Sequence, residues 1–170
     1  MIGALLDWFL GLFRSVPQNT SPAFSAESSG GRLRSVLLFG MKKRGQDQYG
    51  SGSFGALRDG GKRKHEGVDY ESRAGDLVMS PMAGTLTREF QVYKDDSRYR
   101  GIEIKNDKGT HVVKIFYVTA QGKIPRVVRA GDGIGFAQNL SPKYAGITNH
   151  IHIELRVNGQ LENVETWFRN

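Results

Sequence analysis

The chain has 170 residues, 38% of them hydrophobic, which is enough to bury a core as one domain with an appendage. Its 24 Lys and Arg residues against 17 Asp and Glu residues give a formal net charge of +7, which favours acidic partners or anionic surfaces. The absence of cysteine excludes disulfide bonds and thiolate zinc sites, so any metal site must use His, carboxylate and water.

Residues 1–17 predict an amphipathic or targeting helix that ends at Pro17. Its apolar face is formed by Ile2, Leu5, Leu6, Phe9, Leu12 and Phe13. The run is too short to span a bilayer. Three interpretations stay open: a helix on a membrane surface, a docking helix for a protein partner, or the apolar part of a signal peptide cleaved after AFSA. The positive start that is typical of a signal peptide is missing.

Residues 18–31 are rich in Ser, Gly and Pro and predict a flexible linker, so the main domain is expected to occupy residues 32–170. Within it, the folded part proper is expected from Phe54. Basic residues gather at the start of this domain: Arg32, Arg34, Lys42, Lys43, Arg44, Arg58, Lys62, Arg63 and Lys64. No nucleic-acid motif or aromatic interleaving accompanies them, so nucleic acid is an unlikely partner and a solvated basic segment is expected.

Short alternating runs separated by Gly, Asn and Asp then predict a mostly β, antiparallel domain. Residues 77–90 predict two strands around Pro81 and Gly84, and residues 101–118 predict a hairpin that turns at 106–109. Residues 127–137 predict two short strands around a Gly-Asp-Gly turn. Residues 150–161 predict a hairpin with an Asn-Gly turn.

The stretch TNHIHIEL contains the most informative pattern. In a strand, residues two apart point to the same side, so His150, His152 and Glu154 share one face while Ile151 and Ile153 share the other. The stretch HEGVDY adds His65 and Asp69. A catalytic zinc site keeps three protein ligands and one position for water. His65, Asp69 and one histidine of the later pair would supply such a set, and the pattern alone does not choose between the two.

Four stretches of the sequence resemble the motifs of one protein family: FGALRDGGKRKHEGVDY, SPMAGTL, AGDGIGFA and HIHIEL. Together they resemble the lysostaphin/LytM-type zinc peptidases, and within them the leukocyte cell-derived chemotaxin group. The resemblance implies a compact antiparallel β fold around a zinc groove. It also implies that His65, Asp69 and His152 are the zinc ligands and that His150 is the catalytic histidine beside the metal.

The chain departs from the active family members at one important position. Those members carry a further histidine in a Tyr-x-His-Leu motif, whereas this chain reads KIFYVTA. The position falls to Phe116, Tyr117 or Thr119, of which Tyr117 is favoured as the second catalytic residue. A phenol can donate a hydrogen bond to an oxyanion but is a poor base at neutral pH.

Two functions follow from these observations. The first is a zinc-binding, chemotaxin-like interaction module for a peptide or protein partner, weak or inactive as a peptidase. The second is an active zinc metalloendopeptidase that cleaves glycine-containing peptides of the peptidoglycan type. A third interpretation has no metal, with histidines that only form hydrogen bonds in a β core. An extracellular or envelope location is favoured, while the lack of cysteine leaves an intracellular or organellar one open.

Overall fold

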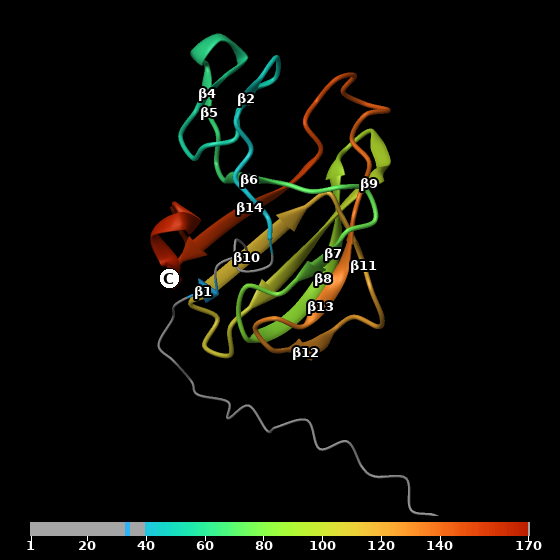
Figure 1. Ribbon diagram of the computed structural model, residues 1–170. Helices are drawn as coiled ribbons and strands as arrows, with labels where there is room; N and C mark the ends of the chain where they lie inside the picture. The colour runs from blue at the N-terminus through green and yellow to red at the C-terminus, as the bar shows by residue number, and fades with distance from the viewer. Residues whose placement is uncertain (1–32, 35–39, 170) are drawn as a thin grey trace, which may run out of the picture.

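The computed structural model describes residues 33–34 and 40–169, which consist of β-strands, two short 3-10 helices and connecting loops (Figure 1). The helix predicted over residues 1–17, the linker predicted over residues 18–31 and the apolar run at 36–39 lie outside the described residues. Within the described ranges, no helix has the length and apolar character needed to cross a bilayer.

The main sheet has seven strands in the order β12-β8-β9-β10-β14-β15, and β6 pairs with β14. The bounds are β6 Val68–Glu71, β8 Gly84–Tyr93, β9 Asp96–Lys105, β10 His111–Phe116, β12 Arg126–Val128, β14 His150–Val157 and β15 Gln160–Glu162. All these pairings are antiparallel. His152 of β14 is paired with Phe116 of β10 on one edge and with Asp69 of β6 on the other. The first half of β14 is therefore an inner strand, and its side chains are held from both sides.

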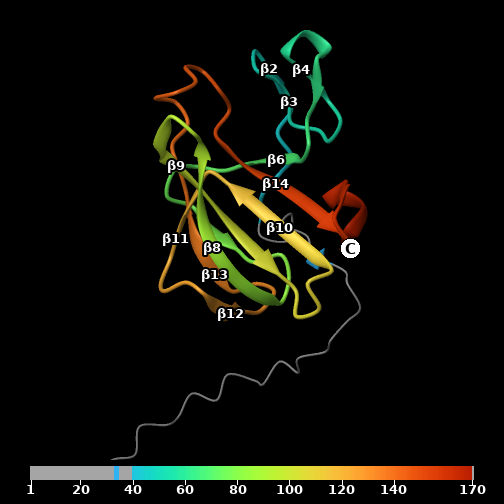
Figure 2. The ribbon, with the colours of Figure 1, turned by 180° about the vertical axis from the view of Figure 1, so that it is seen from behind.

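Smaller sheets complete the domain. A three-stranded sheet has the order β11-β13-β7, with β7 Leu77–Met79, β11 Val118–Ala120 and β13 Gly133–Ala137. Two hairpins join β2 Gln46–Asp47 to β3 Gly50–Ser51 and β4 Leu57–Arg58 to β5 Arg63–Lys64, with the 3-10 helix η2 (Asp59–Gly61) in the second turn. β1 Leu33–Arg34 pairs in parallel with β16 Phe168–Arg169, which follows the 3-10 helix η3 (Val164–Trp167). Both ribbon views show β2 and β4 beside one another beyond one end of the main sheet (Figures 1 and 2).

The hydrophobic core confirms the alternation predicted in TNHIHIEL. Ile151, Ile153 and Leu155 of β14 have no exposed surface, and they pack with the inward residues of β9 and β10. Burying this apolar face is the main favourable term in folding, so it determines which face of β14 is left for the histidines.

The predicted turns are also confirmed. The β9–β10 hairpin closes where Gly109 N–H donates to the carbonyl of Asn106. The β14–β15 hairpin turns at Asn158 and Gly159, both with positive φ (49° and 83°), as the tight Asn-Gly turn requires. The strands predicted within 127–137 exist as β12 and β13, but they belong to different sheets.

The prediction that the folded part begins at Phe54 is wrong, because earlier residues already pack against the sheet. Leu33 is buried in the core, and residues 42–44 run beside β6. Glu71 N–H donates to the carbonyl of Lys42, and Arg44 N–H donates to the carbonyl of Asp69. Backbone pairing with β6 therefore brings part of the basic segment to the end of the sheet.

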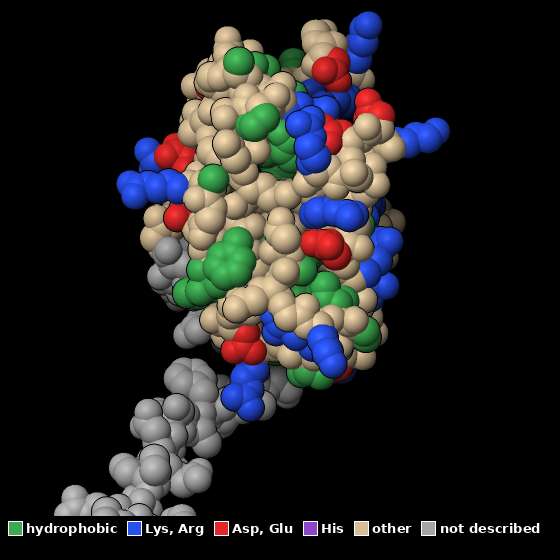
Figure 3. Space-filling model, turned by 90° about the vertical axis from the view of Figure 1, so that its right-hand side faces the viewer, with side chains coloured by type: hydrophobic (Ala, Val, Ile, Leu, Met, Phe, Trp, Pro, Cys, Tyr) green, Lys and Arg blue, Asp and Glu red, His purple; other side chains and the backbone are tan. Residues whose placement is uncertain are grey.

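The basic residues divide into two classes. Lys42 and Lys43 are exposed, as expected of a solvated run, whereas the side chain of Arg44 is only 3% exposed. On the face in Figure 3, Lys and Arg side chains gather along one edge with Asp and Glu among them. Most of the positive charge is therefore at the surface, and Arg44 is an exception that needs a structural reason.

Ile153→Val is expected to lower the free energy of unfolding by about 0.5–1.5 kcal/mol, because it removes one methylene from a fully buried position. Urea denaturation followed by circular dichroism measures this. Val127→Ala is the control, since Val127 is 78% exposed and its truncation should change stability by less than about 0.5 kcal/mol. Equal effects of the two substitutions would contradict the assignment of the buried face.

Candidate metal centre

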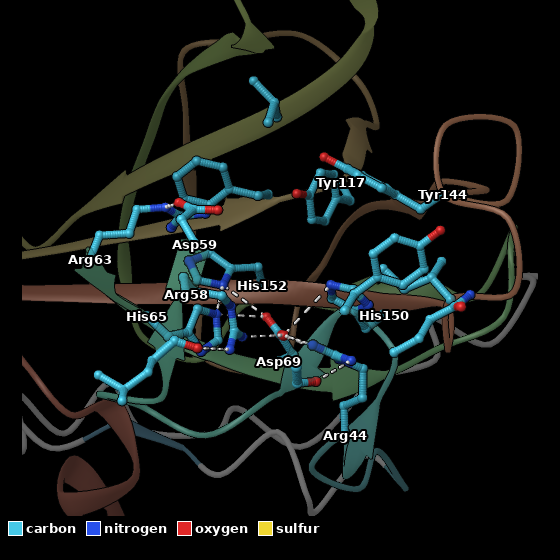
Figure 4. A pocket seen from close by; sticks show the side chains of 17 residues that line it. Arg44, Arg58, Asp59, Arg63, His65, Asp69, Tyr117, Tyr144, His150 and His152 are labelled. Atoms are coloured by element: carbon cyan, nitrogen blue, oxygen red, sulfur yellow. Dashed lines mark hydrogen bonds and ion pairs between the residues drawn. The ribbon is translucent and has the colours of Figure 1, made fainter. Parts of the chain in front are cut away.

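Three side chains with metal-ligating atoms converge where β6 and β14 pair: His65, Asp69 and His152 (Figure 4). His65 follows β5, Asp69 lies in β6 and His152 lies opposite it in β14. His65 Nε2 lies 2.9 Å from His152 Nδ1 and 3.2 Å from Asp69 Oδ1, and His152 Nδ1 lies 2.9 Å from the same oxygen. The three atoms form a small, nearly equilateral triangle.

The outer hydrogen bonds of the two histidines determine which ring nitrogen carries the proton. His65 Nδ1 donates to the carbonyl of Ser53 at 2.8 Å, which leaves the lone pair of Nε2 in the triangle. His152 Nε2 faces Glu154 Oε1 at 3.3 Å, which leaves the lone pair of Nδ1 in the triangle. Three lone-pair atoms at these distances repel one another unless a proton or a cation lies among them.

This donor set fits zinc. Two imidazoles and one carboxylate are the ligands of many catalytic zinc sites, and ligand bonds of about 2.0–2.1 Å in a tetrahedron place ligand atoms about 3.3 Å apart. The observed separations of 2.9–3.2 Å are close to this spacing. The hydrogen bonds to Ser53 and Glu154 are the outer contacts that orient zinc-binding histidines.

Asp69 is ionised in this environment. Burial by itself would raise the pKa of its carboxyl group. In the metal-free triangle, protons on the facing nitrogens of His152 and His65 form hydrogen bonds to Asp69, which outweigh burial and hold its pKa well below its usual range. Its other oxygen, Oδ2, accepts hydrogen bonds from Nε and Nη2 of Arg44 at 3.2 and 2.8 Å. Asp69 therefore presents Oδ1 to the triangle and Oδ2 to Arg44.

Arg44 is fully engaged by this cluster. Besides Asp69, its Nη1 donates to Asp47 Oδ2 at 2.6 Å and to the carbonyl of Gly50 at 3.0 Å. The planar guanidinium thus clamps β6 to the β2–β3 hairpin. Sequence reasoning missed this residue because, in the basic run KKRG, nothing distinguishes Arg44 from its solvated neighbours.

His150 lies next to the triangle rather than in it. Its Nδ1 donates to the carbonyl of Thr148 at 2.7 Å, and its Nε2 lies 3.7 Å from Asp69 Oδ2. Burial lowers the pKa of His150, so the ring is neutral near pH 7 and Nε2 can accept a proton. The ring stands edge-on to Tyr117, with centroids 5.6 Å apart.

Tyr117 has an unusual backbone and a protonated hydroxyl. Its φ of 64° is rare for a residue other than glycine, and such conformations gather at functional sites. Burial raises the pKa of the phenol to about 12. The hydroxyl lies 2.8 Å from that of Tyr93, which lies 2.9 Å from that of Tyr144. Tyr117 can thus donate a hydrogen bond at neutral pH but cannot act as a base there.

These groups line a groove of about 610 Å³. All five residues singled out from the sequence lie in it: His65, Asp69, Tyr117, His150 and His152. Phe116 also lines the groove, its ring against His152, whereas Thr119 is exposed and does not. Sequence reasoning gave no site role to the other lining residues, since no local pattern distinguishes them; they include Arg44, Arg58, Tyr49 and Tyr144.

Two acidic residues and one further histidine lie outside the triangle. Glu66 is exposed, and Glu154 contacts the outer nitrogen of His152. His111 is at the start of β10, bonded to Asn106 and edge-on to Trp167. It is remote from the groove lining.

The fold is that of the lysostaphin-type peptidases. The antimicrobial peptidase lysostaphin from Staphylococcus simulans superposes with a TM-score of 0.60 at 18% identity, over 81% of this chain and 53% of lysostaphin. The separate catalytic domain of lysostaphin superposes on this chain with a TM-score of 0.58 at 20% identity, over 79% of this chain and 97% of that domain. This chain therefore spans about half the length of lysostaphin. A zinc-containing peptidase from Vibrio cholerae superposes with a TM-score of 0.50 at 15% identity, over 78% of this chain and 36% of that chain.

Sequence comparison defines the family more narrowly. No protein-family model matches the chain. Leukocyte cell-derived chemotaxin-2 of Mus musculus is 31% identical over 109 residues, which cover 64% of this chain and 69% of that protein. The chain belongs to the leukocyte cell-derived chemotaxin-2 family, and the expected resemblance is confirmed.

Proposed function

We propose that this chain is a zinc-binding domain that holds peptides in its groove and has weak or no peptidase activity. The observation that carries the proposal is the triangle of His65 Nε2, Asp69 Oδ1 and His152 Nδ1, whose lone pairs all point to one place. A bound zinc would polarise a peptide carbonyl and make water acidic enough to ionise near neutral pH. The named neighbour from Vibrio cholerae, described as zinc containing, supports the choice of metal.

The proposal that peptidase activity is weak or absent rests on the acid–base groups around the triangle. His150 offers one neutral imidazole that can take up a proton at Nε2. Tyr117, the favoured candidate for the position where active members of the family carry a second histidine, offers a hydroxyl with a pKa of about 12. A donor alone can stabilise an oxyanion, but the groove lacks the second base, whose contribution is typically about 10²–10⁴ in rate.

Pentaglycine tests the proposal. The zinc-loaded chain is expected to bind labelled pentaglycine and to cleave it slowly or not at all, as mass spectrometry of the peptide would show. His150→Ala is expected to keep zinc, because His150 lies outside the triangle of ligands. Tyr117→Phe should likewise keep zinc.

The alternative function, an active metalloendopeptidase, is favoured by the free Nε2 of His150 beside the triangle. Rapid cleavage of pentaglycine, lost in His150→Ala while zinc is retained, would establish this alternative and overturn the proposal of a weak enzyme. A chain that binds zinc but no glycyl peptide would overturn the proposal that the groove binds peptides.

A further inference from the structure

Arg58 is a second arginine that turns inward at the groove. It lies in β4, and its side chain is 11% exposed. The Nη2 group donates to the carbonyl of Ser51, and Nη1 lies so close to Gly50 that a Cβ there would be 2.8 Å away. The guanidinium is thus packed on the backbone of the β2–β3 hairpin while it lines the groove.

The charge of Arg58 is poorly compensated. Among the described residues, the one carboxylate within 4 Å is Asp69, whose Oδ2 lies 3.9 Å from Arg58 Nη2. That oxygen already accepts two hydrogen bonds from Arg44. The other acidic residue of the groove lining, Asp59, pairs with Arg63. Burial lowers the pKa of the Arg58 guanidinium, and the charges of Arg44 and Arg63 act in the same direction.

A cation at the triangle would increase this imbalance, because it would draw on the negative charge of Asp69. The groove would then hold the cation and a partly buried guanidinium whose one nearby carboxylate, Asp69, is shared with Arg44 and the cation. A buried charge is costly unless it is paired, so the missing partner is an anion that enters with the ligand. The planar fork of an arginine suits a carboxylate, which it can bind through two parallel hydrogen bonds.

We infer that Arg58 binds a carboxylate of the peptide that occupies the groove, so that the domain prefers acidic or free-acid peptides to neutral ones. This inference rests on the proposed function, since it assumes that the ligand is a peptide. The rings of Tyr49 and Tyr144, which pack edge-to-face in the groove lining, supply an apolar wall against which the rest of the peptide can lie. The carboxylate would sit beside Asp69, next to the triangle (Figure 4).

Three labelled peptides test the inference and distinguish the sources of the carboxylate. They are pentaglycine with a free C-terminus, pentaglycine amide, and the amide with one glycine replaced by glutamate. Fluorescence anisotropy with the zinc-loaded chain at 0.15 M salt gives the affinities, and mass spectrometry confirms that each peptide is intact. At least one of the two acidic peptides is expected to bind about tenfold tighter than the amide. The tighter one shows whether the α-carboxylate or a side-chain carboxylate is recognised.

Arg58→Gln is expected to abolish this preference, so that all three peptides bind the variant with similar affinity. Arg129→Gln is the matched control: it removes the same charge from an exposed turn between β12 and β13 outside the groove, and should keep the preference. Circular dichroism and zinc content show that each variant is folded and loaded. Equal affinities of wild type for all three peptides, or a preference that survives in Arg58→Gln, would overturn the inference.

The result is separable from the proposed function. Zinc content is measured independently, so a chain that carries zinc and binds pentaglycine amide as tightly as both acidic peptides retains the proposed function and loses this inference. A chain without zinc that still prefers the acidic peptides through Arg58 would retain this inference and contradict the proposed zinc-binding function.

Discussion

The purified chain is expected to carry about one zinc ion, and His152→Ala is expected to carry almost none. His152 supplies one of three atoms in the triangle and is held on both edges of its strand, so its truncation leaves the triangle with two ligand atoms. Loss of one of three protein ligands removes most of the binding free energy. Elemental analysis of wild type and variant after dialysis measures the result.

Thermal unfolding gives a second readout of the same site. Zinc that binds only the folded chain stabilises it by about 2.7 kcal/mol when its free concentration is 100 times the dissociation constant. A chelator should therefore lower the melting temperature of the wild type and leave that of His152→Ala unchanged.

Glu66→Gln is the matched control for the zinc prediction, because Glu66 is an exposed carboxylate next to His65 that makes no contact with the triangle. It should keep both zinc and the response to the chelator. A wild-type chain that takes up no zinc even after resupply would refute the metal centre, and with it the proposed function.

Arg44→Ala is expected to lower the free energy of unfolding by about 3–5 kcal/mol, the usual cost of removing one partner of a buried ion pair. The substitution leaves Asp69 and Asp47 without the guanidinium that now bonds both, and Asp69 is only 2% exposed. It also releases the β2–β3 hairpin from β6. Urea denaturation of the zinc-free chain measures the loss.

Lys42→Ala is the control for Arg44. It removes a basic residue of the same segment, but Lys42 is 77% exposed where it pairs with Glu71, and exposed pairs are worth about 0–1 kcal/mol. Added zinc should reduce the defect of Arg44→Ala, since the metal supplies positive charge to Asp69. A defect as small as that of Lys42→Ala would mean that Arg44 does not hold the cluster together.

Local sequence determined the two faces of β14, the position of its turn and most of the candidate metal ligands. Strands alternate with period two, so the pattern in β14 separates Ile151 and Ile153 from His150 and His152 without knowledge of any neighbour. The Asn-Gly turn at 158–159 follows from residues that tolerate positive φ. The lack of cysteine, with clustered His and Asp residues, restricted the candidate metal site to His65, Asp69, His150 and His152, and all four line the groove.

The tertiary structure decided what the two-residue alternation of a strand cannot determine. His150 and His152 share one face, so the pattern could not choose between them as ligands. The register of β14 against β6 pairs His152 with Asp69 and His150 with Glu71, and thereby brings His152 into the triangle. Arg44 belongs to the basic run KKRG, and only its ion pair with Asp69, 25 residues further along the chain, buries it. Arg58 turns inward because its guanidinium packs on the β2–β3 hairpin. The candidate zinc ligands stand in short recognisable motifs, HEGVDY and HIHIEL, so they could be proposed from the sequence. The two arginines stand in no such motif, and their contacts leave no mark on the spacing of neighbouring residues.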